Sequence, residues 1–251
     1  MDEMLPTIRV LIAFALTGLL VLLRLDAQRF GAAEYDEPVA GQSWFSGSVR
    51  RIGWYVLGLG LLLAIFVIHP APWVDLRLAV GDRAGGIVLG IVLGLAGVAQ
   101  AVGLAWYHYR RIRFPDVAAY PGALINEIVT ALIDEGTFRG ALLGFLLVAG
   151  VDPVLAVLAQ GFIYSLATRL GAPGRDRYMF GLSLAIGMIA GWATVATGGI
   201  GAAFLGHAIT RVAVFLVTGH AGQPAPRGRE VEEVERRRRT PDGWAPVEPP
   251  R

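Results

Sequence analysis

The chain has 251 residues, a formal net charge of +2 and an apolar fraction of 55%. Its mean hydropathy of +0.56 places it among membrane proteins rather than ordinary soluble domains. The sequence contains no cysteine, which excludes disulfides and thiolate metal sites.

Long apolar runs predict an all-α fold of membrane-spanning helices, because about 20 apolar residues cross ~30 Å of hydrocarbon. The acidic start, MDEM, lacks the basic region of a signal peptide, so the first run is predicted to be a retained span. A Thr-Gly-Gly turn at 197–199 divides the last uncharged run into two spans. The seven predicted spans cover residues 10–23, 52–68, 84–107, 121–149, 154–168, 180–196 and 201–217.

Seven spans put the two termini on opposite sides of the membrane, and the arginines indicate which side is which. The segments after the first, third, fifth and seventh spans contain 17 arginines, against three on the opposite side. The positive-inside rule therefore predicts an external N-terminus and a cytoplasmic C-terminus. We expect a multi-pass protein of the cell membrane.

The spans suggest three parts: an N-terminal three-span region at 1–117, a four-span core at 118–219 and a charged cytoplasmic tail at 220–251. In the tail, the run EVEEVERRRR is predicted to form two helical turns, and the remainder is predicted to be disordered. Its four arginines either contact anionic lipid or belong to a solvated, charge-balanced segment.

Two further patterns lie inside the spans. In the third span, glycines recur at spacings that predict close helix packing: Gly86, Gly90, Gly94 and Gly97. The fourth span is ~44 Å long if it is one continuous helix, so it is expected to tilt or to project beyond the bilayer.

The fourth span is also unusual because its stretch 125–145 carries the ionisable residues Glu127, Asp134, Glu135 and Arg139. Such groups are costly in hydrocarbon and are expected to face a protein interior and serve a purpose. On a helix, Glu127 and Asp134 share a face, whereas Asp134 and Glu135 point roughly 100° apart. Glu135 and Arg139 have the spacing of an ion pair within one helix.

Residues 134–140 read DEGTFRG. This pattern resembles the first motif of the CAAX protease and bacteriocin-processing (CPBP) family of intramembrane proteases, in which two glutamates are followed after two residues by Phe-Arg-Gly. Farther on, TGGIGAAFLGHAITR resembles the family's third motif, a Thr-Gly turn followed by His-x-x-x-Asn. The resemblance covers residues 120–216.

The correspondence with the family's motifs is partial. Asp134 stands at the first glutamate, whereas Glu135, Arg139 and His207 match. The second motif, Phe-x-x-x-His, falls best on residues 164–168, where Thr168 replaces the histidine. In the third motif, Arg211 replaces the asparagine.

The resemblance implies a polytopic helical fold with a site inside the membrane that opens to the cytoplasm. It also implies hydrolysis of peptides near a membrane-proximal or prenylated C-terminus. In the family, a glutamate and a histidine activate water, while a second histidine and an asparagine stabilise the oxyanion. Carried over, Asp134, Glu135 and His207 form the water-activating set.

The resemblance also suggests the partners of this chain. We expect a membrane protein or lipid-anchored peptide as substrate, contact with the lipid bilayer and no nucleic acid. Asp134, Glu135 and His207 could in principle bind zinc, but no His-x-x-x-His pair is present, and we expect neither a metal nor a cofactor.

Other interpretations stay open. The first is a catalytically silent relative that acts as a scaffold, chaperone or immunity factor, because Thr168 cannot shuttle a proton as a histidine does. Arg211 either assists the oxyanion or neutralises the acids. Glu135 and Arg139 also fit a purely structural pair. Another is a transporter subunit with a polar pathway, although no internal repeat is evident.

The residues themselves yield one geometric expectation. We predict that Asp134, Glu135, His207 and Arg211 converge on one cavity in the cytoplasmic half of the protein. The oligomeric state is left open by the sequence.

Overall fold

The computed structural model describes residues 4–27, 29–30, 44–109, 112, 121–170 and 177–218. Within these ranges the secondary structure is helical, without strands, as the sequence predicted. The predicted helical turns of the tail lie outside the described residues. The helices are α1 (Met4–Leu25), α2 (Trp44–Ile68), α3 (Pro72–Asp75), α4 (Arg83–Tyr109), α5 (Pro121–Glu135), the π-helix η2 (Gly136–Leu142), α6 (Leu143–Val148), α7 (Pro153–Leu170), α8 (Arg177–Thr197) and α9 (Gly201–Thr218).

Each of the seven predicted spans coincides with helical structure. In the described part of the chain, four helices are long and apolar enough to cross a membrane: Met4–Leu25, Val49–Ile68, Arg83–Tyr107 and Phe180–Thr197. Two more apolar helices, Pro153–Thr168 and Gly201–Val217, are shorter. The exact number of crossings and the side of each terminus stay predictions.

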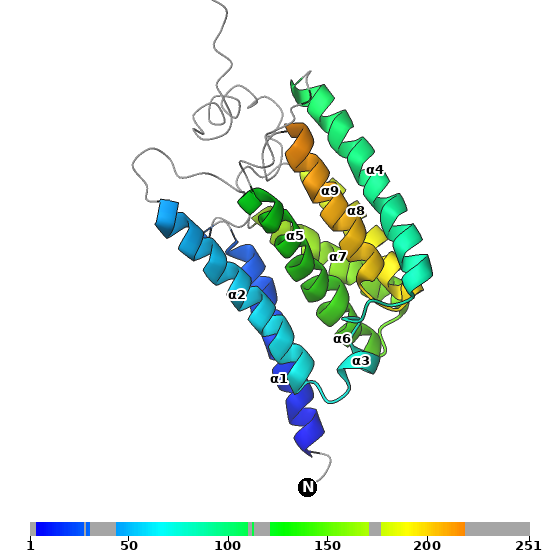
Figure 1. Ribbon diagram of the computed structural model, residues 1–251. Coiled ribbons are helices and arrows are strands. Elements are labelled where there is room, and N and C mark those ends of the chain that lie inside the picture. The colour runs from blue at the N-terminus through cyan, green and yellow to red at the C-terminus, as the bar shows by residue number, and fades with distance from the viewer. Residues whose placement is uncertain are drawn as a thin grey trace, which may run out of the picture.

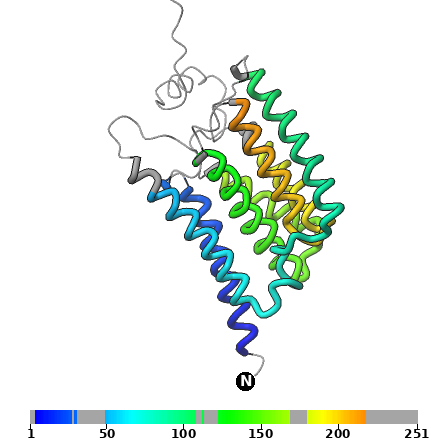
Figure 2. Tube along the Cα trace, in the orientation of Figure 1, coloured from blue at the N-terminus to red at the C-terminus, as the bar shows by residue number. Residues whose placement is uncertain are grey.

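The charged segment runs through the middle of the bundle (Figure 1). There α5, η2 and α6 follow one another without a break, as expected of one long span. On one side of it α1 pairs with α2, and on the other α4 pairs with α9 (Figures 1 and 2). The remaining pair, α7 and α8, also packs against the central segment.

This arrangement explains how the bundle tolerates several charges. Outer helices present apolar side chains to their surroundings: Leu11 on α1, Val56 on α2 and Val92 on α4 are each more than half exposed. By contrast, every residue of η2 is buried. The outer helices therefore supply an apolar surface, and the ionisable groups lie in the protein interior where they can find partners.

Glycines set the close pairing of α4 with α9. A Cβ atom on Gly90 would lie 2.9 Å from Leu205 Cβ, and one on Gly94 would lie 2.7 Å from Ile209 Cδ1. A Cβ on Gly97 would collide with the side chain of Thr210. Any larger residue would push the helices apart, so the predicted close packing is confirmed at these three glycines.

The connection 76–82 threads between η2 and the turn before α9. The N–H of Arg77 donates to Gly140 O at 3.1 Å, and the N–H of Asp82 donates to Thr197 O at 2.7 Å. Gly198 has φ +77°, a left-handed conformation that favours glycine, so the predicted Thr-Gly turn is confirmed. The short helix α3, which begins at Pro72, was not predicted, because the sequence indicated only a connection there.

Candidate functional site

The site is built around the junction of α5 and η2. Glu135 is the last residue of α5, and the π-helix carries Arg139 in the next turn. Single-turn π segments inside α-helices are frequent at functional sites, because they break the regular register of the side chains. Two glycines let neighbours approach η2: a Cβ on Gly136 would lie 2.7 Å from Leu62 Cδ1, and one on Gly140 would collide with Leu78.

Asp134 is engaged by an arginine of α1. Its Oδ1 lies 2.8 Å from Arg24 Nε, and the side chains are 1% and 3% exposed, respectively. This buried ion pair joins α5 to α1. The sequence placed Asp134 with His207, but neighbouring residues on a helix diverge by roughly 100°, and the structure directs Asp134 to α1 and Glu135 to α9.

Glu135 contacts two partners through one carboxylate oxygen. Its Oε1 lies 2.7 Å from His207 Nδ1 and 3.3 Å from Arg139 NH1. Glu135 and Arg139 are fully buried, and His207 is 9% exposed. The predicted Glu135–Arg139 pair is present, and the same acid also holds the histidine of α9.

Tyr164 of α7 packs between these charged groups. The guanidinium carbon of Arg139 lies 4.0 Å from the centre of the Tyr164 ring, a cation–π contact. His207 meets the same ring edge to face, with 6.3 Å between ring centres. The sequence suggested that Tyr164 is a core or interface aromatic, and the structure shows that it also supports two of the predicted site residues.

Arg211 is engaged by a different acid. Its Nε lies 2.7 Å from Glu127 Oε2. Asn126 donates to Glu127 Oε1 at 3.2 Å and accepts from the hydroxyl of Tyr55 at 2.7 Å. Arg211 is therefore the last member of a series of polar contacts that begins with Tyr55 on α2. The sequence left open that Arg211 neutralises Asp134 and Glu135, but its ion pair is with Glu127. The sequence singled out Glu127 as an ionisable residue of the fourth span but gave no reason to place it in the site.

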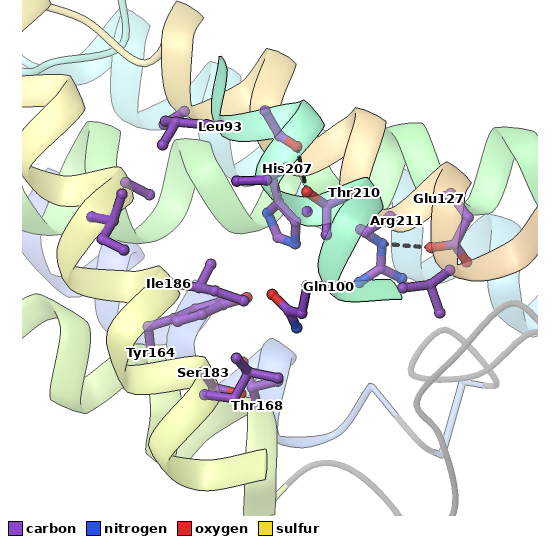
Figure 3. A pocket seen from close by; sticks show the side chains of 18 of the residues that line it. Leu93, Gln100, Glu127, Tyr164, Thr168, Ser183, Ile186, His207, Thr210 and Arg211 are labelled. Carbon is purple, nitrogen blue, oxygen red and sulfur yellow. Dashed lines mark hydrogen bonds and ion pairs between the residues drawn. The ribbon is translucent and has the colours of Figure 1, made fainter. Parts of the chain in front are cut away.

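A cavity of about 230 Å³ lies beside His207 and Arg211. Side chains of α4, α5, α7, α8 and α9 surround it (Figure 3). Its walls are largely apolar, as at Leu93 and Ile186. Polar groups line the remainder: Gln100, Glu127, Tyr164, Thr168, Ser183, His207, Thr210 and Arg211.

Four of these lining residues, Tyr164, Thr168, His207 and Arg211, belong to the second and third motifs of the sequence analysis. Residues 116–213 match a family model described as Rce1-like, type II CAAX prenyl endopeptidase. Residues 116–213 are therefore similar to the type II CAAX prenyl endopeptidases, and we call them the Rce1-like region. No curated protein and no solved structure matches the chain.

The Rce1-like region extends from before α5 into α9, so the family resemblance read from the motifs is confirmed. Helices α1 to α4 lie outside it. Even so, α4 lines the cavity of the Rce1-like region and α1 supplies Arg24 to Asp134.

Within the Rce1-like region, His207 lies between an acid and the cavity. An ionised Glu135 only accepts hydrogen bonds, so His207 Nδ1 is the donor, and in the neutral imidazole the lone pair is on Nε2. The ring of His207 points into the cavity (Figure 3). This geometry suits an imidazole that takes a proton from a molecule in the cavity, oriented by the carboxylate behind it.

The structure also bears on the zinc set considered from the sequence. Within the described ranges, no group of three histidine or acidic side chains is placed to hold a metal ion. Asp134, one of the three candidate ligands, is directed to Arg24 instead. Thr168 lines the cavity at the position of the histidine in the family's second motif. Its buried hydroxyl has no hydrogen bond within the described part of the chain.

Proposed function

We propose that the chain is a CPBP-type intramembrane endopeptidase that hydrolyses membrane-associated peptides or proteins. His207 acts as the general base, and Glu135 positions it. The observation that carries this proposal is the 2.7 Å contact between His207 Nδ1 and Glu135 Oε1 beside the cavity. Carboxylate-oriented histidines of this kind activate nucleophiles on unrelated folds.

The proposed reaction uses one water molecule. Its oxygen bonds to the carbonyl carbon of the substrate peptide while its proton moves to His207 Nε2, and the carbonyl oxygen becomes an oxyanion. Glu135 stabilises the imidazolium that forms. The C–N bond then breaks, the carbonyl re-forms, and the proton passes from Nε2 to the leaving nitrogen. Asp134 takes no part in this scheme, because Arg24 engages it.

The membrane setting belongs to the same proposal. With seven crossings and a cytoplasmic C-terminus, the ends of α4, α7 and α9 that carry Gln100, Thr168 and Arg211 lie on the cytoplasmic side. The cavity then opens in the cytoplasmic half, within reach of membrane-proximal segments. Its apolar walls suit a substrate that stays in the lipid phase.

A catalytically silent relative is the second candidate, and two observations favour it. Thr168 occupies the position of the histidine in the family's second motif, and Arg211 forms an ion pair with Glu127. In addition, Glu135 and His207 are in direct contact, which leaves no space for a water molecule between them. Such a protein would bind membrane proteins as a scaffold, chaperone or immunity factor.

A cleavage assay separates the two candidates. The purified protein is reconstituted in liposomes with two quenched fluorescent peptides, one farnesylated near its C-terminus and one containing an apolar membrane-spanning segment. If the chain is an endopeptidase, the wild type cleaves a peptide and His207→Ala does not. Asp152 is an exposed residue that caps the start of α7, and Asp152→Asn should cleave at the wild-type rate. Binding without cleavage by the wild type, unaffected by His207→Ala, supports the silent relative.

A further inference from the structure

Gln100 on α4 is a polar side chain of the cavity that no motif of the Rce1-like region includes. It lines the cavity, and Figure 3 shows its amide among His207, Tyr164 and Thr168. No hydrogen bond holds this amide within the described part of the chain. An amide carries two donor hydrogens and one acceptor oxygen, so this side chain can bind a molecule in the cavity.

The position of Gln100 is fixed by helix packing rather than by a loop. Gly97, one turn before it, lies so close to Thr210 that an added Cβ would collide. Thr210 and Arg211 follow His207 by one turn on α9, and both line the cavity. The glycine contacts therefore hold Gln100 in register with the turn of α9 that carries the proposed base.

The proposed hydrolysis requires donors for the oxyanion, and this chain lacks the asparagine that the family resemblance implies for that role. The third-motif histidine, His207, is engaged as the proposed base. Arg211, in place of the asparagine, is held through its Nε by Glu127 at 2.7 Å. A neutral amide facing the cavity is a group that stabilises an oxyanion without first breaking an ion pair.

We propose that Gln100 is a catalytic residue whose side-chain N–H donates a hydrogen bond to the oxyanion of the tetrahedral intermediate. This inference rests on the proposed endopeptidase function. It assigns to α4, outside the Rce1-like region, a direct part in the chemistry. No proton is transferred: the amide stabilises the negative charge on the former carbonyl oxygen while His207 holds the proton taken from water.

The test uses the reconstituted full chain and the farnesylated quenched peptide. Gln100→Leu removes the donor with little change in volume, and Gln100→Asn keeps an amide one methylene shorter. The loss of one oxyanion donor typically lowers kcat by about 10²–10³-fold, so we expect that loss in Gln100→Leu with little change in KM. Gln100→Asn is expected to recover part of the rate, which a purely structural role would not require.

A matched control is available on α7. Gln160 is a buried glutamine whose amide donates to Gly187 O at 2.8 Å, away from the cavity lining. Gln160→Leu should lower thermal stability but leave kcat per folded molecule unchanged. Cleavage by the wild type with an equal kcat in Gln100→Leu overturns the role of Gln100 and leaves the proposed function standing. No cleavage of either peptide by the wild type overturns both.

Discussion

Glu135 and His207 are 72 residues apart in the sequence, and their side chains meet at 2.7 Å in the interior of the bundle. The contact joins the centre of the charged segment to α9, and the cavity lies on the far side of the histidine ring. Arg139 shares the same carboxylate oxygen, so Glu135 organises both neighbours. The neighbouring acid, Asp134, instead forms an ion pair with Arg24 of α1.

The Arg24–Asp134 pair should be a stability element. Both side chains are nearly inaccessible, and removal of one partner leaves the other charge buried without compensation. We expect Arg24→Leu or Asp134→Asn to reduce the free energy of unfolding by about 3–5 kcal/mol, and the double change Arg24→Leu with Asp134→Leu to recover most of it. Unfolding in detergent, followed by circular dichroism, measures this.

The exposed pair Arg29–Asp26 is the control for that experiment. Its atoms lie 3.4 Å apart, and the side chains are 81% and 51% exposed. Arg29→Leu should leave the free energy of unfolding almost unchanged, since surface pairs contribute little. If Arg24→Leu were equally harmless, the buried pair would not hold α1 to the core.

Gly97 should be intolerant of a side chain, because a Cβ there meets Thr210. We expect Gly97→Ala to destabilise the protein by about 1–3 kcal/mol, the usual cost of overpacking. Gly103 lies on the same helix, and a Cβ added there would have open space around it. Gly103→Ala should be neutral or slightly stabilising, because alanine is the better helix former. Equal thermal midpoints for the two variants would contradict the packing described for α4 and α9.

His69, beyond the end of α2, should make stability depend on pH. Burial lowers its pKa below the ordinary value of 6.5, and nearby Asp75 only partly opposes this. Its Nδ1 accepts a hydrogen bond from the N–H of Ala71 at 3.2 Å, so the ring is neutral in the folded state. A lowered pKa means that the unfolded chain binds the proton first.

The stability that depends on neutral His69 is therefore fully present above pH 6.5 and is lost as the pH falls through the folded-state pKa. Thermal midpoints of the wild type and His69→Gln, measured at about pH 7.5 and about pH 5, check this. The wild type should lose more stability on acidification than the variant. Parallel losses would show that His69 does not titrate in this way.

Much of the fold was predictable because the dominant signals are local. Apolar runs placed the helices, glycine spacing predicted the packing of Gly90, Gly94 and Gly97, and the Thr-Gly turn matches the positive φ at Gly198. The i,i+4 spacing also anticipated the pair of Glu135 with Arg139. All these features depend on residues a few positions apart.

The pairings between helices were not predictable in the same way. Three arginines inside helices could each neutralise one of three acids, and only the packing of the helices assigns Arg24 to Asp134 and Arg211 to Glu127. Within an apolar run, no sequence pattern distinguishes a π-helix from an α-helix, so the π-helix could not be predicted. Gln100 belongs to no motif, so only its position in the cavity lining indicates a role in the site.

Glu135 and His207 are proposed to act as one water-activating unit, and a double-mutant cycle of the two residues tests this coupling. Cleavage of the farnesylated peptide is measured for the wild type, Glu135→Gln, His207→Ala and the double variant, each corrected for folded protein. We expect a loss near 10⁴-fold in Glu135→Gln, as for the acid of a catalytic triad, and no further loss when it is combined with His207→Ala. Losses that multiply in the double variant, or wild-type rates in Glu135→Gln, would show that the two residues do not act as one unit.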